Sequence, residues 1–202
     1  MNSRIRYRLF DIPLPERDLC FFDLETTRLD LKAEIIEIGA IRVEPKEFRV
    51  LNELEIKIKP EKISEADPEG LAISGYSDDD WREAVELEIG IKTFLEFAEG
   101  TVLVANNLPF DWMWLQKAVE DLNLQPTYFF KGLDIFSLAW LKFKTKPRTE
   151  PLASGSGAWD EETPNLSLKQ LATHFNIDMG KHHRALDDAK TAYQVFLNLV
   201  NT

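Results

Sequence analysis

The hydrophobic pattern of the N-terminal third predicts three β-strands. Residues 19–25 begin with a nearly all-apolar run of the kind that forms a buried strand. Residues 34–43 are rich in β-branched side chains and predict a second strand. Residues 53–59 alternate strictly between apolar and charged side chains, which is typical of a strand with one face on the core and one in water. Because short connections join these strands, we expect antiparallel pairing.

After residue 60, segments with a helical period alternate with short apolar runs. Apolar residues recur at helical spacing between 84 and 98; we expect the acids at 78–80 to cap this helix and Gly100 to end it. Strand and helix then alternate, which predicts parallel additions to the sheet. The predicted class is therefore α/β: a mixed five-stranded sheet, with three antiparallel strands and then parallel additions, flanked by helices. The remaining predicted elements are strands at 101–105 and 128–133 and helices at 110–122, 135–141, 167–175 and 185–200.

Residues 145–164 interrupt this order. The segment is rich in Pro, Gly, Ser and Thr, and it predicts a long mobile loop rather than a domain boundary. A length of 202 residues is typical of one domain, so we expect residues 1–202 to form a single domain.

Composition and charge narrow the class of protein. Apolar residues at 44% and charged residues at 29% are typical of a soluble globular protein. No apolar run approaches about 18 residues, so no membrane partner is expected. Cys20, the single cysteine, lies in a predicted core strand and favours a reducing, cytoplasmic setting. The net charge of −11 argues against coating nucleic acid through bulk electrostatics. It does not exclude an enzyme, because bound cations cancel part of the local charge.

Two acids follow the apolar run of the first predicted strand. Asp23 and Glu25 lie two residues apart, so on a strand their side chains point to the same face. Two carboxylates held together there repel and lose water unless a cation lies between them, which indicates a divalent metal site. A strand that simply ends here, with both acids solvated, is the alternative. Asp111 and Asp188 lie at the starts of predicted helices, where each acid alone would be explained by the helix dipole.

Three segments, taken in order, resemble the motifs of the DEDDh 3′–5′ exonucleases. Residues 22–27 (Phe-Asp-Leu-Glu-Thr-Thr), with 35–40 (Ile-Ile-Glu-Ile-Gly-Ala), resemble the first motif. Residues 107–111 (Asn-Leu-Pro-Phe-Asp) resemble the second, and residues 183–189 (His-Arg-Ala-Leu-Asp-Asp-Ala) resemble the third. That family includes the proofreading subunit of the bacterial replicative DNA polymerase, ribonuclease T and oligoribonuclease. The resemblance covers residues 19–199 and implies a ribonuclease H-like fold.

The resemblance also implies a cofactor and a set of catalytic residues. The cofactor would be two divalent metal ions, Mg²⁺ or Mn²⁺, about 3.5–4 Å apart, which activate the attacking water and stabilise the leaving 3′ oxygen. Asp23, Glu25 and Asp188 would hold the ions, and Asp111 would support the second ion, largely through water. His183 would be the general base, because an imidazole with an ordinary pKa of about 6.5 can accept a proton at neutral pH.

Substrate contacts follow from the same resemblance. Thr26 and Thr27 would border the pocket for the last nucleotide. Glu69 begins a segment similar to one that contacts the terminal nucleotide in proofreading subunits. The departures from the family, none of which removes an acid or the base, are Arg28, commonly glycine, and Asn106 and Ser74, each commonly histidine.

The expected function is a metal-dependent 3′–5′ exonuclease that releases nucleoside 5′-monophosphates from the 3′ end of a single strand. DNA is favoured over RNA as the substrate, and a DNA polymerase is a further expected partner. One alternative is an exoribonuclease of the ribonuclease T or oligoribonuclease type. The other is a non-catalytic module on the same fold that binds nucleic acid or a polymerase.

Overall fold

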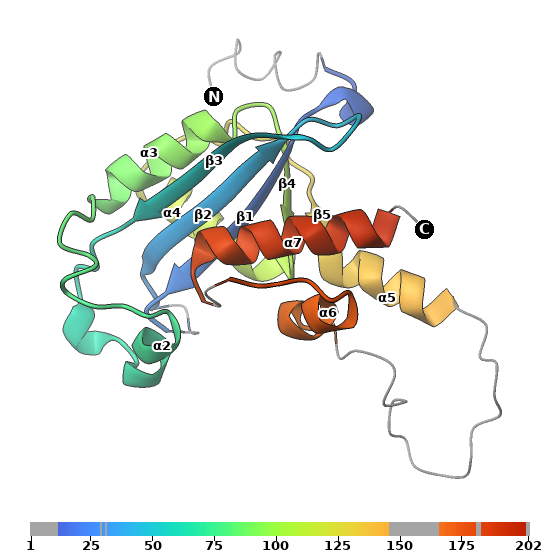
Figure 1. The fold of residues 1–202 in the computed structure, drawn as a ribbon. Coiled ribbons are helices and arrows are strands. Elements are labelled where there is room, and N and C mark those ends of the chain that lie inside the picture. Colours follow the sequence, from blue (N-terminus) through green and yellow to red (C-terminus); the bar gives the residue numbers. More distant parts are fainter. Residues whose placement is uncertain (1–11, 29, 31, 146–165, 181–182, 201–202) are drawn as a thin grey trace, which may run out of the picture.

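The computed structural model describes residues 12–28, 30, 32–145, 166–180 and 183–200. Its centre is a five-stranded sheet of order β3-β2-β1-β4-β5 (Figure 1). The first three strands pair antiparallel, and β4 and β5 add in parallel beside β1. This arrangement confirms the predicted mixed sheet. The strands are β1 (Leu19–Thr26), β2 (Ile35–Val43), β3 (Val50–Lys57), β4 (Val102–Ala105) and β5 (Leu133–Asp134).

Helices cover both faces of this sheet (Figure 1). One hydrophobic cluster joins the sheet to α3 and α4, and a second joins it to α5, α6 and α7. Among the described residues, no helix combines the length and the apolar character that crossing a membrane would need. The helices are α2 (Pro68–Ile73), α3 (Leu87–Phe97), α4 (Leu108–Asp121), α5 (Ile135–Thr145), α6 (Leu168–His174) and α7 (Ala185–Val200), with 3₁₀ turns η1 (Leu14–Glu16) and η2 (Ile63–Glu65).

The alternation of side chains along β1 decides which residues face which layer. Cys20, Phe22 and Leu24 belong to the cluster with α3 and α4, whereas Leu19 and Phe21 belong to the cluster with α7. The ring of Phe21 packs edge-on against two aromatic rings of α7. The same alternation carries the next odd-numbered residues of β1 to the face that α7 covers.

The helix predicted from residue 84 begins later, at Leu87, and the acids at 78–80 do not cap it. The preceding residues run beside the end of β3 instead, since the Val85 N–H donates to the carbonyl of Lys57 (2.9 Å). Trp81 is buried there, and its indole N–H donates to the carbonyl of Ile36 (2.9 Å). Tertiary hydrogen bonds therefore take the place of the first helical turn.

Two further predictions concern the C-terminal half. The strand predicted at 128–133 is wrong for most of its length, because β5 contains only Leu133–Asp134. The apolar run before it packs into the core instead: Tyr128 and Phe129 are buried, and the Phe129 N–H donates to the carbonyl of Thr101 (2.8 Å). The loop predicted at 145–164 lies, beyond its first residue, outside the described residues; α5 itself continues to Thr145.

Candidate metal centre

The first two acids of the site lie on the face of β1 that α7 covers. Asp23 and Glu25 continue the odd-numbered face that Leu19 and Phe21 begin. In the antiparallel ladder with β2, Asp23 lies opposite Gly39 and Glu25 lies opposite Glu37. Both side chains are partly buried at the end of the strand.

The N-terminus of α7 docks on β2 at Gly39. A Cβ atom at this position would lie 2.0 Å from the carbonyl carbon of Ala185 and 2.0 Å from the nitrogen of Leu186. Only a glycine therefore allows the helix backbone to approach so closely. Because Gly39 lies directly opposite Asp23, this contact brings the first turn of α7 over the acids of β1.

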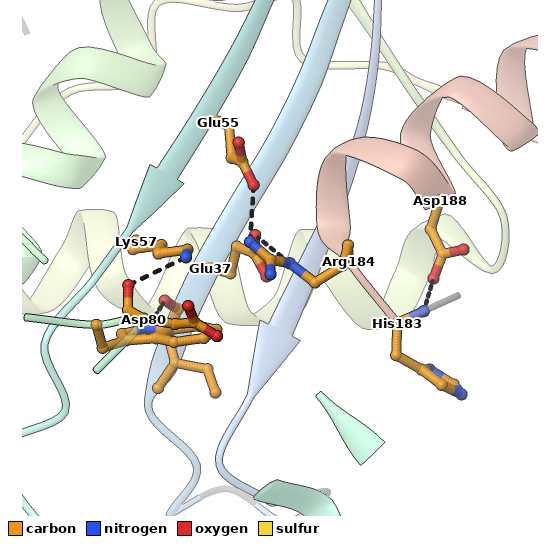
Figure 2. Close-up of polar contacts among 9 residues, drawn as sticks. Glu37, Glu55, Lys57, Asp80, His183, Arg184 and Asp188 are labelled. Carbon is orange, nitrogen blue, oxygen red and sulfur yellow. Dashed lines mark hydrogen bonds and ion pairs between the residues drawn. The ribbon is translucent and has the colours of Figure 1, made fainter. Parts of the chain in front are cut away.

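Asp188 lies in that first turn and is 5% exposed. Its Oδ2 accepts a hydrogen bond from the backbone N–H of His183 (3.2 Å; Figure 2). His183 adopts a left-handed backbone conformation, with φ of 66°. The hydrogen bond therefore closes a tight turn that carries the imidazole to the start of the helix.

Glu25, His183 and Asp188 converge. Each offers one ligand atom, and the three atoms lie within 4.8 Å of one another. Carboxylate oxygens and an imidazole nitrogen at this spacing could hold a metal ion. Asp23 and Asp111 are not members of this tight group of described residues, but both act on it electrostatically.

Asp111 reaches the site from the opposite layer of the protein. It lies in the first turn of α4 and is 3% exposed. Asp134 holds the start of this helix, because its Oδ1 accepts from the N–H groups of Asn107 (3.0 Å) and Leu108 (3.1 Å). The Oδ1 of Asp111 then accepts from the backbone N–H of Leu24 (3.1 Å), between the two acids of β1.

Burial and mutual repulsion raise the pKa values of these acids. For Asp23, burial comes first, followed by the charges of Asp111, Glu25 and Asp188, and together they raise its pKa well above the ordinary range. Burial and the Asp188 charge raise the pKa of Glu25 to about 8. Burial raises the pKa of Asp111 to about 8. Burial disfavours the charge on all three acids, and neighbouring carboxylates also disfavour it on Asp23 and Glu25, so a divalent cation among them would be strongly favoured. The donor set therefore fits a metal ion.

The residues predicted to contact substrate lie at the end of β1 and in α2. Thr26 and Thr27 are buried, and their hydroxyls serve the local turn: Thr26 donates to the carbonyl of Arg28 (2.8 Å), and Thr27 accepts from the N–H of Glu34 (3.0 Å). Glu69 lies in α2, and its side chain is outside the described residues. Contact of these three residues with substrate stays a prediction.

Glu37 and Arg184 are site residues to which the sequence analysis gave no role. Arg184 precedes α7 and forms ion pairs with Glu37 and Glu55 (Figure 2). Burial raises the pKa of Glu37 to about 7, Arg184 lowers it, and Glu55 raises it again. A signal was present in the sequence, since Glu37 is an acid within the apolar run of β2, but its partner could not be identified without the docked helix.

Comparisons with known proteins agree with this geometry. The RNase_T family model, described as an exonuclease, matches residues 20–196. The PolC-type DNA polymerase III of Caldanaerobacter subterraneus subsp. tengcongensis is 29% identical over 187 residues, which make up 92% of this chain but only 12% of that protein. The chain thus spans about an eighth of this relative.

Solved structures share the fold at low sequence identity. Escherichia coli exonuclease I in complex with a dT13 oligonucleotide has a TM-score of 0.73 at 14% identity, over 90% of this chain and 41% of that chain. The nuclease domain of 3′hExo, a DEDDh family member bound to rAMP, has a TM-score of 0.71 at 16% identity, over 92% of both chains. These likenesses confirm the expected ribonuclease H-like fold.

Proposed function

The chain belongs to the exonuclease family whose model matches residues 20–196, and on this premise we propose that it is a metal-dependent 3′–5′ exonuclease. It releases nucleoside 5′-monophosphates from the 3′ end of a single strand, with DNA favoured over RNA. The observation that carries the proposal is the convergence of Glu25, His183 and Asp188 beside two further acids whose charges act on the same point.

The acids would hold the metal ions. Asp23, Glu25 and Asp188 would bind two divalent ions, Mg²⁺ or Mn²⁺, and Asp111 would support the second. When bound, these ions supply the Lewis acidity that activates water and stabilises the leaving 3′ oxygen. Mg²⁺ suits such a set because it keeps several waters and uses few carboxylates.

The His183 ring moves the proton. Its ligand nitrogen lies within 4.8 Å of carboxylate oxygens of Glu25 and Asp188, so it borders the place where the attacking water is activated. The imidazole nitrogen accepts the proton of that water as the phosphodiester is attacked, which is general base catalysis.

The substrate and partner follow from what the similar proteins bind. One structural neighbour is in complex with a dT13 oligonucleotide and another is bound to rAMP, which supports a nucleic-acid strand as the substrate of this fold. The relatives are PolC-type DNA polymerases of which this chain matches about 12% of the length. We therefore propose that the chain acts on 3′ ends presented by a DNA polymerase.

The test is cleavage of 5′-labelled single-stranded DNA, single-stranded RNA and duplex DNA, with Mg²⁺, with Mn²⁺ and with chelator. We expect stepwise shortening of the DNA strand from its 3′ end, abolished by chelator. Asp188→Asn should reduce cleavage to background, whereas the matched control Asp187→Asn, in the same helical turn, should retain it. Faster cleavage of RNA than of DNA would show that RNA is the preferred substrate. Turnover in Asp188→Asn, or metal binding by the wild type without any cleavage, would contradict the proposed enzymatic function.

A further inference from the structure

Glu37 is an unusual residue to find inside a sheet. It lies within β2, its side chain is 0% exposed, and no N–H or O–H donor of the described residues reaches its Oε2. An isolated carboxylate buried in this way is costly unless a cation pairs with it. The partner is Arg184, whose Nε lies 3.2 Å from the Oε1 of Glu37.

Arg184 spans two strands. Its Nη2 donates to the Oε1 of Glu55 on β3 (2.9 Å) while its Nε holds Glu37 on β2. The guanidinium also lies 5.7 Å from the centre of the Trp81 ring, which is itself held to β2 through the carbonyl of Ile36. A planar guanidinium with several fixed donors can make these contacts at once, which a lysine could not.

We call the ion pairs of Arg184 with Glu37 and Glu55 the clamp. The clamp is adjacent in sequence to His183 of the candidate site. His183 has a φ of 66°, and a non-glycine residue in this left-handed conformation is strained and persists only where its surroundings fix it. Its backbone is held on one side by Asp188, and the next residue is Arg184. Figure 2 shows the His183 ring and the Arg184 side chain leaving the chain on different sides.

We infer that Glu37 and Arg184 are positioning residues, which hold the turn before α7 so that the His183 ring lies at the metal centre. This inference rests on the proposed function. Stability alone does not explain the clamp, because replacing a buried ion pair by apolar residues is often neutral or stabilising. The geometry of the clamp instead fixes the position of the turn, because it joins β2 and β3 to Arg184, the residue that follows the proposed base His183.

Steady-state kinetics of Glu37→Gln and Arg184→Lys provide the test. We expect kcat to fall by about 10- to 100-fold, because a misplacement on the order of 1 Å costs about 10²-fold, while the KM for a single-stranded oligonucleotide changes little. Glu55→Gln, at the more exposed end of the clamp, should lower kcat by less. The matched control is Glu53→Gln, which breaks the exposed ion pair between β3 and Lys190 of α7 (2.7 Å) and should leave kcat unchanged.

A second readout separates this inference from the proposed function. The ring protons of His183, assigned with His183→Gln, should shift in the NMR spectra of Glu37→Gln and Arg184→Lys but not in that of Glu53→Gln, whether or not the wild type cleaves DNA. Unshifted ring signals overturn the inference, as does an unchanged kcat in both clamp variants of an active enzyme. If Glu37→Gln does not fold, Arg184→Lys and Glu55→Gln provide the test of the inference. A wild-type kcat in both of these variants would then overturn it.

Discussion

Gly39→Ala tests how closely the candidate site depends on the docking of α7. The added methyl group would lie 2.0 Å from backbone atoms of Ala185 and Leu186. Cβ atoms essentially never approach another heavy atom closer than 3.0 Å, so the first turn of α7 must retreat by about 1 Å, because no flexible side chain is there to yield. Asp188 and His183 belong to that turn and its approach, and they retreat with it.

The magnitudes follow from this displacement. A misplacement on the order of 1 Å costs about 10²-fold in rate, so we expect kcat of Gly39→Ala to fall by about that factor. Overpacking should lower the free energy of unfolding by about 1–3 kcal/mol, and Tm by about 2–4 °C for each kcal/mol.

The assays are cleavage of labelled single-stranded DNA and thermal unfolding followed by circular dichroism. The matched control is Gly90→Ala in α3, whose Cβ would meet side-chain atoms of Ile58 at 2.8 Å and of Ile56 at 3.4 Å, in the hydrophobic cluster that does not include α7. That variant should retain wild-type kcat whatever its Tm. A folded Gly39→Ala with kcat within about threefold of wild type would refute the coupling of the site to this contact.

Two other predictions follow. Glu25 has a pKa raised from about 4.5 to about 8 in the folded protein, so without metal the folded state binds more protons than the unfolded state between these pH values. The free energy of unfolding should therefore fall as pH rises from 5 to 8 in the presence of chelator. This fall should be smaller in Glu25→Gln, and smaller in the wild type with saturating Mg²⁺. An equal dependence on pH in Glu25→Gln would show that Glu25 is not its cause. Trp81→Phe removes the buried indole N–H that donates to the carbonyl of Ile36. This carbonyl still accepts from the N–H of Ile58 and is not left unpaired, so the free energy of unfolding should fall by only about 1 kcal/mol. Urea denaturation measures this change, and an unchanged midpoint would show that the indole hydrogen bond contributes nothing.

The fold was predictable where the period of apolar residues was long and clear. The bounds of α7 agree with the prediction, and β1 and β2 agree to within one residue at either end. The helix predicted from residue 84 begins late because Trp81 and Val85 are held by distant carbonyls, at Ile36 and Lys57, which a local pattern does not reveal. The error at 128–133 arose because an apolar run has the same appearance whether it pairs in a sheet or only packs.

The candidate site was predictable from motif order more than from any single residue. The family match confirms the exonuclease prediction, and the structure brings Glu25, His183 and Asp188 together. The roles of these residues stay predictions until variants are measured. A role for Glu37 could not be assigned from the sequence, because its partner Arg184 lies near it only in the folded protein. Gly39 of β2 allows the start of α7 to pack closely on the sheet, and this packing places Arg184 beside Glu37.

The distribution of the acids along the chain has a consequence during synthesis. Asp23 and Glu25 leave the ribosome early, Asp111 emerges midway, and Asp188 emerges last, on the helix that closes over the sheet. A nascent chain can thus build most of its strands while it still lacks the groups needed to cut a phosphodiester. On the proposed function, the chain cannot cut nucleic acid until α7 docks on the sheet.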